Sequence, residues 1–119
     1  MVSSMDAPAG ITLDENGVPT QYSAVITGSA TAYSASEGAY TASGMKAAVG
    51  RVAVNPNLIP YGTKLFIRTT DGSYIYGYAV AADTGTASMD GRAIVDLFFN
   101  SYEESCQFGR RNVEIYVLS

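Results

Sequence analysis

Apolar and polar side chains alternate along much of the chain after residue 22, which is the pattern of half-buried β-strands. The alternation is clearest over residues 63–68 and 73–82, where the dipeptide Asp71-Gly72 separates two apolar runs and predicts a β-hairpin. A glycine at position 28 is expected to weaken the first strand. The predicted strands cover residues 23–34, 49–54, 63–68, 73–82, 93–99 and 112–118.

A single helix is predicted over residues 102–108, between the last two strands. Ser101 and Glu104 have the spacing of a capping box, and Gly109 supplies a C-terminal stop. Residues 1–21 are rich in Pro, Gly, Ser, Asp and Asn and are expected to form a flexible lead-in, and residues 37–44 to form a loop. Six or seven short strands with one short helix favour a mainly β fold, a small closed barrel over residues 22–119.

Composition narrows the range of functions. The 119 residues suffice for one domain with one core, and the formal net charge of −4 disfavours nucleic acid as a partner because phosphates would find no basic patch. The chain has no histidine and one cysteine, which excludes histidine-dependent nucleophiles, an intrachain disulfide and a cysteine zinc site. Cys106 is expected to be a half-buried thiol packed on the helix. No apolar run approaches the roughly 18–20 residues of a membrane-spanning helix, and the sequence indicates neither a metal nor a cofactor.

Two acids stand in apolar sequence, whereas the others lie beside turns, at the predicted helix start, on an outer strand face or in the tail. Asp83 ends the apolar run 78–82, and Asp96 lies within the run 94–99. Both faces of the strand around Asp96 are apolar, so its carboxyl should be partly desolvated and its pKa raised. An acid that stays protonated near neutral pH can act as a general acid. The alternative is that Asp96 accepts hydrogen bonds within the barrel and only holds a loop.

The triplet Asp83-Thr84-Gly85 after an apolar strand also resembles the signature of aspartic proteases. In that class the triplet comes early in the chain and most of the fold follows it. Here the triplet ends at residue 85 of 119, and the later apolar segment ending in glycine that this class requires is absent. The position of the triplet therefore disfavours a protease.

Several longer motifs follow one another in order along about 90 residues. They are Ala30-Thr31-Ala32-Tyr33-Ser34, Thr41-Ala42-Ser43-Gly44, the run from Val52 to Leu65, Ala82-Asp83-Thr84-Gly85, Val95-Asp96-Leu97-Phe98 and Phe108-Gly109-Arg110-Arg111-Asn112-Val113. Together these motifs resemble the three-aspartate domain, a bacterial double-psi β-barrel found in stationary-phase survival proteins and A-type membrane-bound lytic transglycosylases.

The resemblance implies cleavage of peptidoglycan at the β-1,4 bond between N-acetylmuramic acid and N-acetylglucosamine, with a 1,6-anhydro sugar as product. Asp96 matches the catalytic acid/base, and Asp83 matches the acid that supports it. Asn55 stands where the family has its first aspartate and is expected to keep the turn hydrogen bonds without the charge. The loop 86–92 departs from the family pattern and is expected to shape the groove differently. The positions expected to contact substrate are Tyr33, Thr41, Thr84 and Gly85.

Two other functions remain open. The chain could be a non-catalytic barrel that binds glycan strands, a reading that Asn55 favours, or a structural module of a longer surface protein. The expected partner is peptidoglycan, the expected location is outside the cell or in its envelope, and the expected state is a monomer. The first ten residues lack the basic and apolar regions of a signal peptide.

Overall fold

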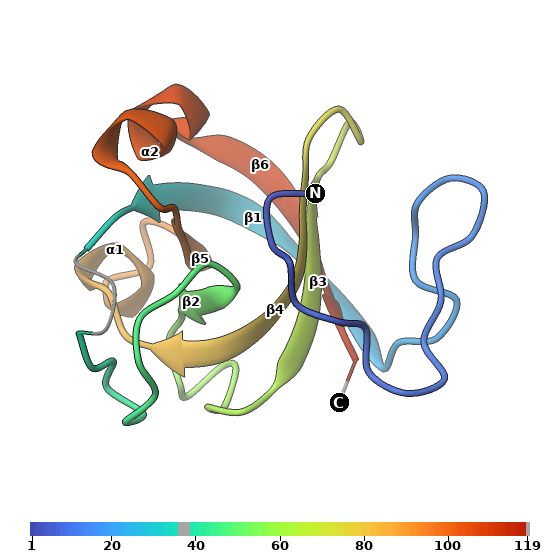
Figure 1. Cartoon of the computed structure of the whole chain (residues 1–119), viewed down its shortest axis with the longest axis horizontal. Helices are drawn as coiled ribbons and strands as arrows, with labels where there is room; N and C mark the ends of the chain where they lie inside the picture. The colour runs from blue at the N-terminus through green and yellow to red at the C-terminus, as the bar shows by residue number, and fades with distance from the viewer. Residues whose placement is uncertain (36–38, 119) are drawn as a thin grey trace.

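The computed structural model describes residues 1–35 and 39–118, and it shows a closed barrel of six strands (Figure 1). Residues 37 and 38 of the predicted loop lie outside the described residues. The mainly β class and the barrel that the sequence predicts are both confirmed. The strands are β1 (Ala24–Tyr33), β2 (Arg51–Ala53), β3 (Lys64–Thr69), β4 (Ile75–Asp83), β5 (Val95–Phe98) and β6 (Arg111–Val117), and the helices are α1 (Thr86–Met89) and α2 (Tyr102–Phe108).

The strands follow one another around the barrel in the order β1-β5-β2-β4-β3-β6, and β6 pairs with β1 to close it. The pairs β1–β5 and β2–β4 are parallel, and the other pairs are antiparallel. Parallel partners need long crossover connections, so strands that are distant in sequence become neighbours. The β3–β4 hairpin turns at Asp71, whose carboxylate accepts hydrogen bonds from the Ser73 amide and from the hydroxyls of Ser73 and Thr69. These bonds lower the pKa of Asp71 to about 2.

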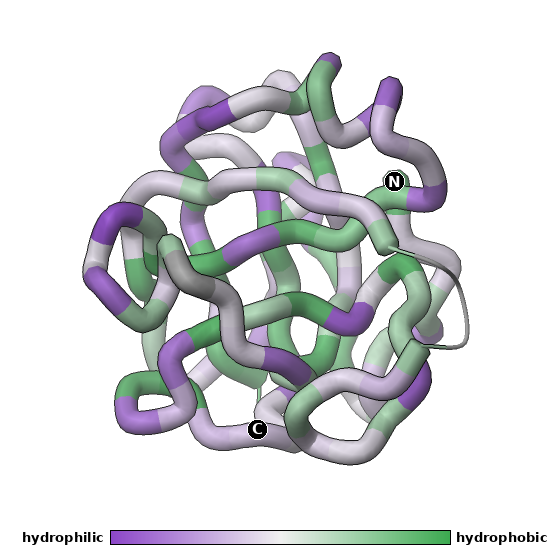
Figure 2. The backbone as a smooth tube through the Cα atoms, turned by 90° about the vertical axis from the view of Figure 1, so that its left-hand side faces the viewer, coloured by the Kyte–Doolittle hydropathy of each residue, from purple (hydrophilic) through white to green (hydrophobic). Residues whose placement is uncertain are grey.

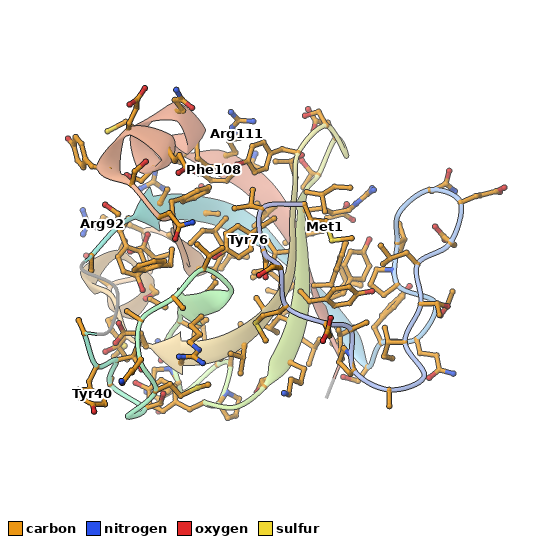
Figure 3. The ribbon with its side chains drawn as sticks, in the orientation of Figure 1. Met1, Tyr40, Tyr76, Arg92, Phe108 and Arg111 are labelled. Carbon is orange, nitrogen blue, oxygen red and sulfur yellow. The ribbon has the colours of Figure 1, made fainter. Side chains whose placement is uncertain are left out.

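The core fills the barrel interior with side chains from alternate strand positions. Figure 2 shows hydrophobic and hydrophilic stretches interspersed along the backbone. Tyr76 lies near the centre of the molecule (Figure 3), where its hydroxyl donates to the Phe98 carbonyl at 2.7 Å and accepts from the Gly50 amide at 2.9 Å. The fully buried members of the core include Val52, Val54, Leu65, Ile67, Val95, Leu97, Phe99, Val113 and Ile115.

The N-terminal residues pack against the outside of the barrel. The amide of Ser3 donates to the Tyr76 carbonyl at 2.7 Å. A second apolar cluster, centred on Phe66, Tyr78 and Tyr116, is covered by the lead-in side chains Met5, Ile11, Leu13 and Val18. This packing extends the apolar contact of the barrel beyond its interior. The flexibility predicted for residues 1–21 stays a prediction.

Two local features differ from the sequence-based expectations, whereas the weakening expected at Gly28 stays a prediction. The segment expected to be a loop after Gly85 contains helix α1. Strand β1 continues through Gly28, where a Cβ atom would lie 2.8 Å from Cγ2 of Ile94, so the glycine makes room for that side chain. Cys106 is exposed and not half-buried, because α2 turns only Ser105 and Phe108 inward. Among the residues that the structure describes, neither helix is long and apolar enough to cross a membrane.

The N-terminal cap of α2 is present as predicted, and its loss should have a measurable cost. The Ser101 hydroxyl accepts from the Glu104 amide at 3.1 Å and donates to the Glu104 carboxylate at 3.2 Å. Replacing Ser101 with alanine should lower the free energy of unfolding by about 1 kcal/mol, measured by urea denaturation. The control is Glu103→Ala, because Glu103 is exposed in the same turn. Equal stability of both variants and the wild type would contradict this assignment.

Candidate functional site

The two acids singled out from the sequence lie in one row across neighbouring strands. Asp96 on β5 pairs with Thr31 on β1 to one side and with Ala53 on β2 to the other. Ala53 in turn pairs with Asp83 at the end of β4. Two strand spacings separate the acid backbones, which corresponds to about 10 Å between their Cα atoms. The two acids thus flank Ala53, which is buried.

A register shift between β2 and β4 brings Asp83 into this row. Val52 pairs with Ala81, but Ala53 pairs with Asp83, so the ladder skips Ala82. Without the shift, Ala53 would pair with Ala82 and Asp83 would fall one residue beyond the row. Irregularities of this kind re-aim side chains, and they are frequent next to functional sites.

Asp96 is half-buried and accepts a hydrogen bond from the Thr31 hydroxyl at 2.9 Å. Burial of the carboxyl raises the pKa of Asp96, the hydrogen bond from Thr31 opposes that rise, and the negative charge of Asp83 adds to it. The direction agrees with the expectation from the apolar sequence around Asp96. The carboxyl is therefore biased toward its protonated form, as a general acid requires.

Asp83 holds a loop as well as placing a charge near Asp96. Its Oδ1 atom accepts from the backbone amides of Thr84 and Ala42, each at 2.9 Å. The Ser43 amide donates to the carbonyl of Ala82 at 3.0 Å, next to the same point. Residues 40–46 are thereby fixed to the end of β4. The loop-holding role that the sequence left open for Asp96 is therefore found at Asp83.

Asn55 closes the turn that follows β2. Its Oδ1 atom accepts from the Asn57 amide at 3.0 Å, and its carbonyl accepts from the amides of Leu58 and Ile59, both at 2.9 Å. All hydrogen bonds described for Asn55 acceptors stay within this turn. The residue keeps the local geometry that was expected of it, and it brings no charge to the acid row.

The residues expected to contact substrate occupy different places around the row. Thr84 and Gly85 directly follow Asp83, and both are half-buried. Thr41 is buried in the loop held by Asp83, and its hydroxyl donates to the Met45 carbonyl at 2.8 Å. Tyr33 ends β1 with its ring edge-on to Phe98, at 5.4 Å between ring centroids. The side chains of Asn55 and Thr41 thus form hydrogen bonds within their own loops. Tyr33, Thr84 and Gly85 lie next to Asp83 or Asp96.

Sequence reasoning missed Thr31 and Ala53, which complete the row. Thr31 stands between Ala30 and Ala32, which belong to the core or pack against it, so the strand period alone places Thr31 and Tyr33 on the opposite face. That signal was available from the sequence. Ala53 carried no such signal, because its place between the acids depends on which strands pair and in which register.

Gly85 is packed so closely against Asp96 that an added methyl group should change how the acid titrates. A Cβ atom at position 85 would lie 3.2 Å from Oδ2 of Asp96 and 3.5 Å from Cβ of Ala53. Gly85→Ala should therefore displace solvent from the carboxyl and raise the pKa of Asp96 by roughly half a pH unit, measured by carboxyl NMR titration. The matched control is Met89→Ala on the exposed side of α1. A lowered or unchanged titration of Asp96 in Gly85→Ala would contradict this packing.

Away from the acid row, the described residues offer little evidence of a ligand site. Within residues 1–35 and 39–118, no group of three or more His, Cys, Asp or Glu side chains is arranged to hold a metal ion. A hollow of about 260 Å³ lies at the β3–β4 hairpin, and neither acid of the row lines it. The residues that line it are Thr69, Thr70, Asp71, Ser73, Arg111 and Asn112.

The strand order and the two parallel pairs define a closed six-stranded β-barrel, and two acids lie in one row across its strands. A family model described as the 3D domain matches residues 50–119, which is more than half of the chain. The chain therefore belongs to the 3D domain family, and the resemblance read from its motifs is confirmed.

Two relatives from Bacillus subtilis (strain 168) are similar in sequence. "Putative cell wall shaping protein YabE" is 37% identical over 68 residues, which is 57% of this chain and 15% of that protein. "Cell wall-binding protein YocH" is 35% identical over 103 residues, which is 79% of this chain and 32% of that protein. The chain thus spans less than a third of the length of either relative.

Proposed function

We propose that this domain acts on the bacterial cell wall as a lytic transglycosylase, with peptidoglycan glycan strands as its substrate. The observation that carries the proposal is a half-buried acid, Asp96, whose pKa is raised and which lies in one row with Asp83. Membership of the 3D domain family and the cell-wall names of both relatives support this substrate class. The same names support a location outside the cell or in its envelope.

One acid can carry the complete reaction. Protonated Asp96 donates its proton to the glycosidic oxygen as the bond from that oxygen to C1 of N-acetylmuramic acid breaks. The C6 hydroxyl of the same sugar then bonds to C1, and its proton passes to the Asp96 carboxylate. The bond broken and the bond formed balance, no water is consumed, and Asp96 returns to its protonated form. Glycosidases that hydrolyse the bond need two carboxyls with separate roles.

The other site residues support this reaction through their effects on Asp96 and on the substrate. The Asp83 charge raises the pKa of Asp96, so that more of the acid is protonated at the start. Thr31 orients one carboxyl oxygen. The sequence-based substrate contacts at Tyr33, Thr41, Thr84 and Gly85 belong to this proposal. Of these four, Thr41 acts through the shape of its loop, because its hydroxyl is already bonded to Met45.

Exposed apolar side chains on the surrounding segments suit the rings of a glycan strand. Tyr40 is 75% exposed in the loop that Asp83 holds, and it lies at the edge of the molecule (Figure 3). Leu58 and Tyr61 are exposed after the Asn55 turn, and Met89 is exposed on α1. Tyrosine suits sugar binding because the face of its ring packs on a sugar while its hydroxyl stays hydrated. We propose that the glycan strand follows these side chains past the acid row.

The second candidate function is glycan binding without cleavage, and two observations favour it. Asn55 supplies no charge, and its bonds serve the turn. One relative is named a cell wall-binding protein. In this case the exposed side chains would still bind peptidoglycan, and Asp96 would contribute only to the fold.

Incubation with purified peptidoglycan separates the two functions. A transglycosylase releases soluble muropeptides that carry 1,6-anhydro-N-acetylmuramic acid, which mass spectrometry identifies by the absence of added water. A binding module sediments with the peptidoglycan and releases nothing. Absence of both release and sedimentation would reject both functions. The same samples, run on a sizing column with light scattering, test whether the domain is a monomer.

A further inference from the structure

The Tyr33 hydroxyl is buried and, among the described residues, has no hydrogen-bond partner. Its ring is held in place by the edge of Phe98, at an interplanar angle of 88°. A buried hydroxyl without a partner costs about 1–3 kcal/mol, so it calls for an explanation in a folded protein. Phenylalanine would make the same ring contact without this cost. The hydroxyl therefore has a use that ring packing does not explain.

The position of Tyr33 points to the acid row. Tyr33 lies two residues after Thr31 on β1, so both side chains leave the strand on one face. Their partners on β5 are Phe98 and Asp96, respectively. Burial is the main cause that raises the pKa of Tyr33, and the charges of Asp83, Asp96 and, last, the neighbouring Tyr76 add to it. The hydroxyl thus stays protonated beside both acids, as a donor requires.

Of the two acids, Asp96 has fewer donors. Asp83 accepts two backbone amides, whereas the hydrogen bond described for the Asp96 carboxyl comes from Thr31 alone. Oδ2 of Asp96 faces Gly85, which has no side chain to donate. When Asp96 loses its proton, a half-buried carboxylate is left with one neutral donor and with the Asp83 charge nearby. Such a carboxylate needs another hydrogen bond.

We propose that Tyr33 is a positioning residue that donates its hydroxyl hydrogen to the Asp96 carboxylate whenever Asp96 is ionised. The phenol keeps its proton throughout, so no proton transfer to Tyr33 is involved. In the protonated state that precedes the reaction, Asp96 offers no carboxylate charge to this donor; the structure shows the Tyr33 hydroxyl without a partner among the described residues. Hydrogen bonds of catalytic groups are often long or misaligned before the reacting state forms. The catalytic use of this bond rests on the proposed function, whereas the bond itself does not.

Carboxyl NMR titration of the whole chain tests the proposal without any activity measurement. In Tyr33→Phe the ionised form of Asp96 loses a donor, so its titration midpoint should rise by about one pH unit. The matched control is Tyr78→Phe, because Tyr78 lies in the outer apolar cluster and only burial raises its pKa. An Asp96 midpoint that stays unchanged or falls in Tyr33→Phe overturns the proposal. A midpoint that moves at Asp83 and not at Asp96 also overturns it.

Thermal unfolding and product release complete the test. Tyr33→Phe should unfold at the same temperature as the wild type or higher, because it removes an unpaired buried group. Its rate of anhydro-muropeptide release should nevertheless fall about 10- to 100-fold, the effect of one hydrogen bond to a charged group. Full release by Tyr33→Phe would overturn the catalytic use of the bond. If the wild type itself releases nothing, the transglycosylase function fails, and the NMR titration still decides whether Tyr33 donates to Asp96.

Discussion

Replacing Asp96 with asparagine should reduce the release of anhydro-muropeptides by about 10²- to 10⁴-fold, the usual contribution of a positioned general acid. The asparagine side chain has nearly the same shape, and its carbonyl oxygen can still accept the Thr31 hydroxyl. It cannot supply the proton that the leaving oxygen needs. Timed digestion of peptidoglycan followed by mass spectrometry measures the loss.

The same substitution should leave the protein at least as stable at neutral pH. The pKa of Asp96 is raised in the folded state, so the folded protein holds this proton more tightly than the unfolded chain. The stabilisation from this proton is complete at pH values below the pKa of Asp96 in the unfolded chain. It is lost as the pH rises through the pKa of Asp96 in the folded protein. The Asp96→Asn side chain does not titrate, so the variant loses no stability in this way as the pH rises. Unfolding would therefore not explain its reduced release of anhydro-muropeptides. The matched control is Asp90→Asn, because Asp90 is exposed and paired with Arg92. Equal release by the wild type and Asp96→Asn would refute the acid/base role.

Two substitutions of Asp83 should separate its charge from its hold on the loop. Asp83→Asn keeps an oxygen for the amides of Ala42 and Thr84 and removes the charge. Because that charge raises the pKa of Asp96, its removal should move the upper limb of the pH–rate profile to lower pH. Release at pH 7 should fall accordingly, while hydrogen exchange at Ala42 stays slow.

Asp83→Ala should lose the charge and the loop together. The Ala42 amide then has no side-chain acceptor at the end of β4, so its hydrogen exchange should become faster. Product release should fall by about 10²-fold, as expected when a group beside the reacting atoms is misplaced by an ångström. If alanine and asparagine at position 83 give the same rate and the same exchange, the loop has no part in the site.

The sequence predicted those features that depend on local pattern. Alternating and continuous apolar runs identified every strand of the barrel, and the apolar neighbours of Asp96 indicated its raised pKa. The apolar setting also singled out both acids, and motif resemblance identified the family. The helix α1 was missed because its four residues form less than two turns and carry no amphipathic period.

The features that the sequence did not reveal depend on pairing between distant strands. The skipped residue Ala82 brings Asp83 into the row, and no local pattern marks it. The bond from Ala42 to Asp83 joins residues 41 positions apart. Tyr33 was predicted to offer its ring to a sugar, whereas the structure shows the ring edge-on to Phe98 and the hydroxyl without a partner. Each of these contacts forms only when the barrel has closed.

Strand β1 both closes the barrel and completes the site, yet it precedes the region that the family model matches. β1 lies between β5 and β6 and places Thr31 beside Asp96. A piece starting at residue 50 would keep both acids but would leave β5 and β6 with open edges. Supplying residues 1–49 as a separate peptide would restore the missing strand together with the loop that Asp83 holds. The domain therefore offers a natural split point between β1 and β2, at which the return of folded structure would report the reassociation of two fragments.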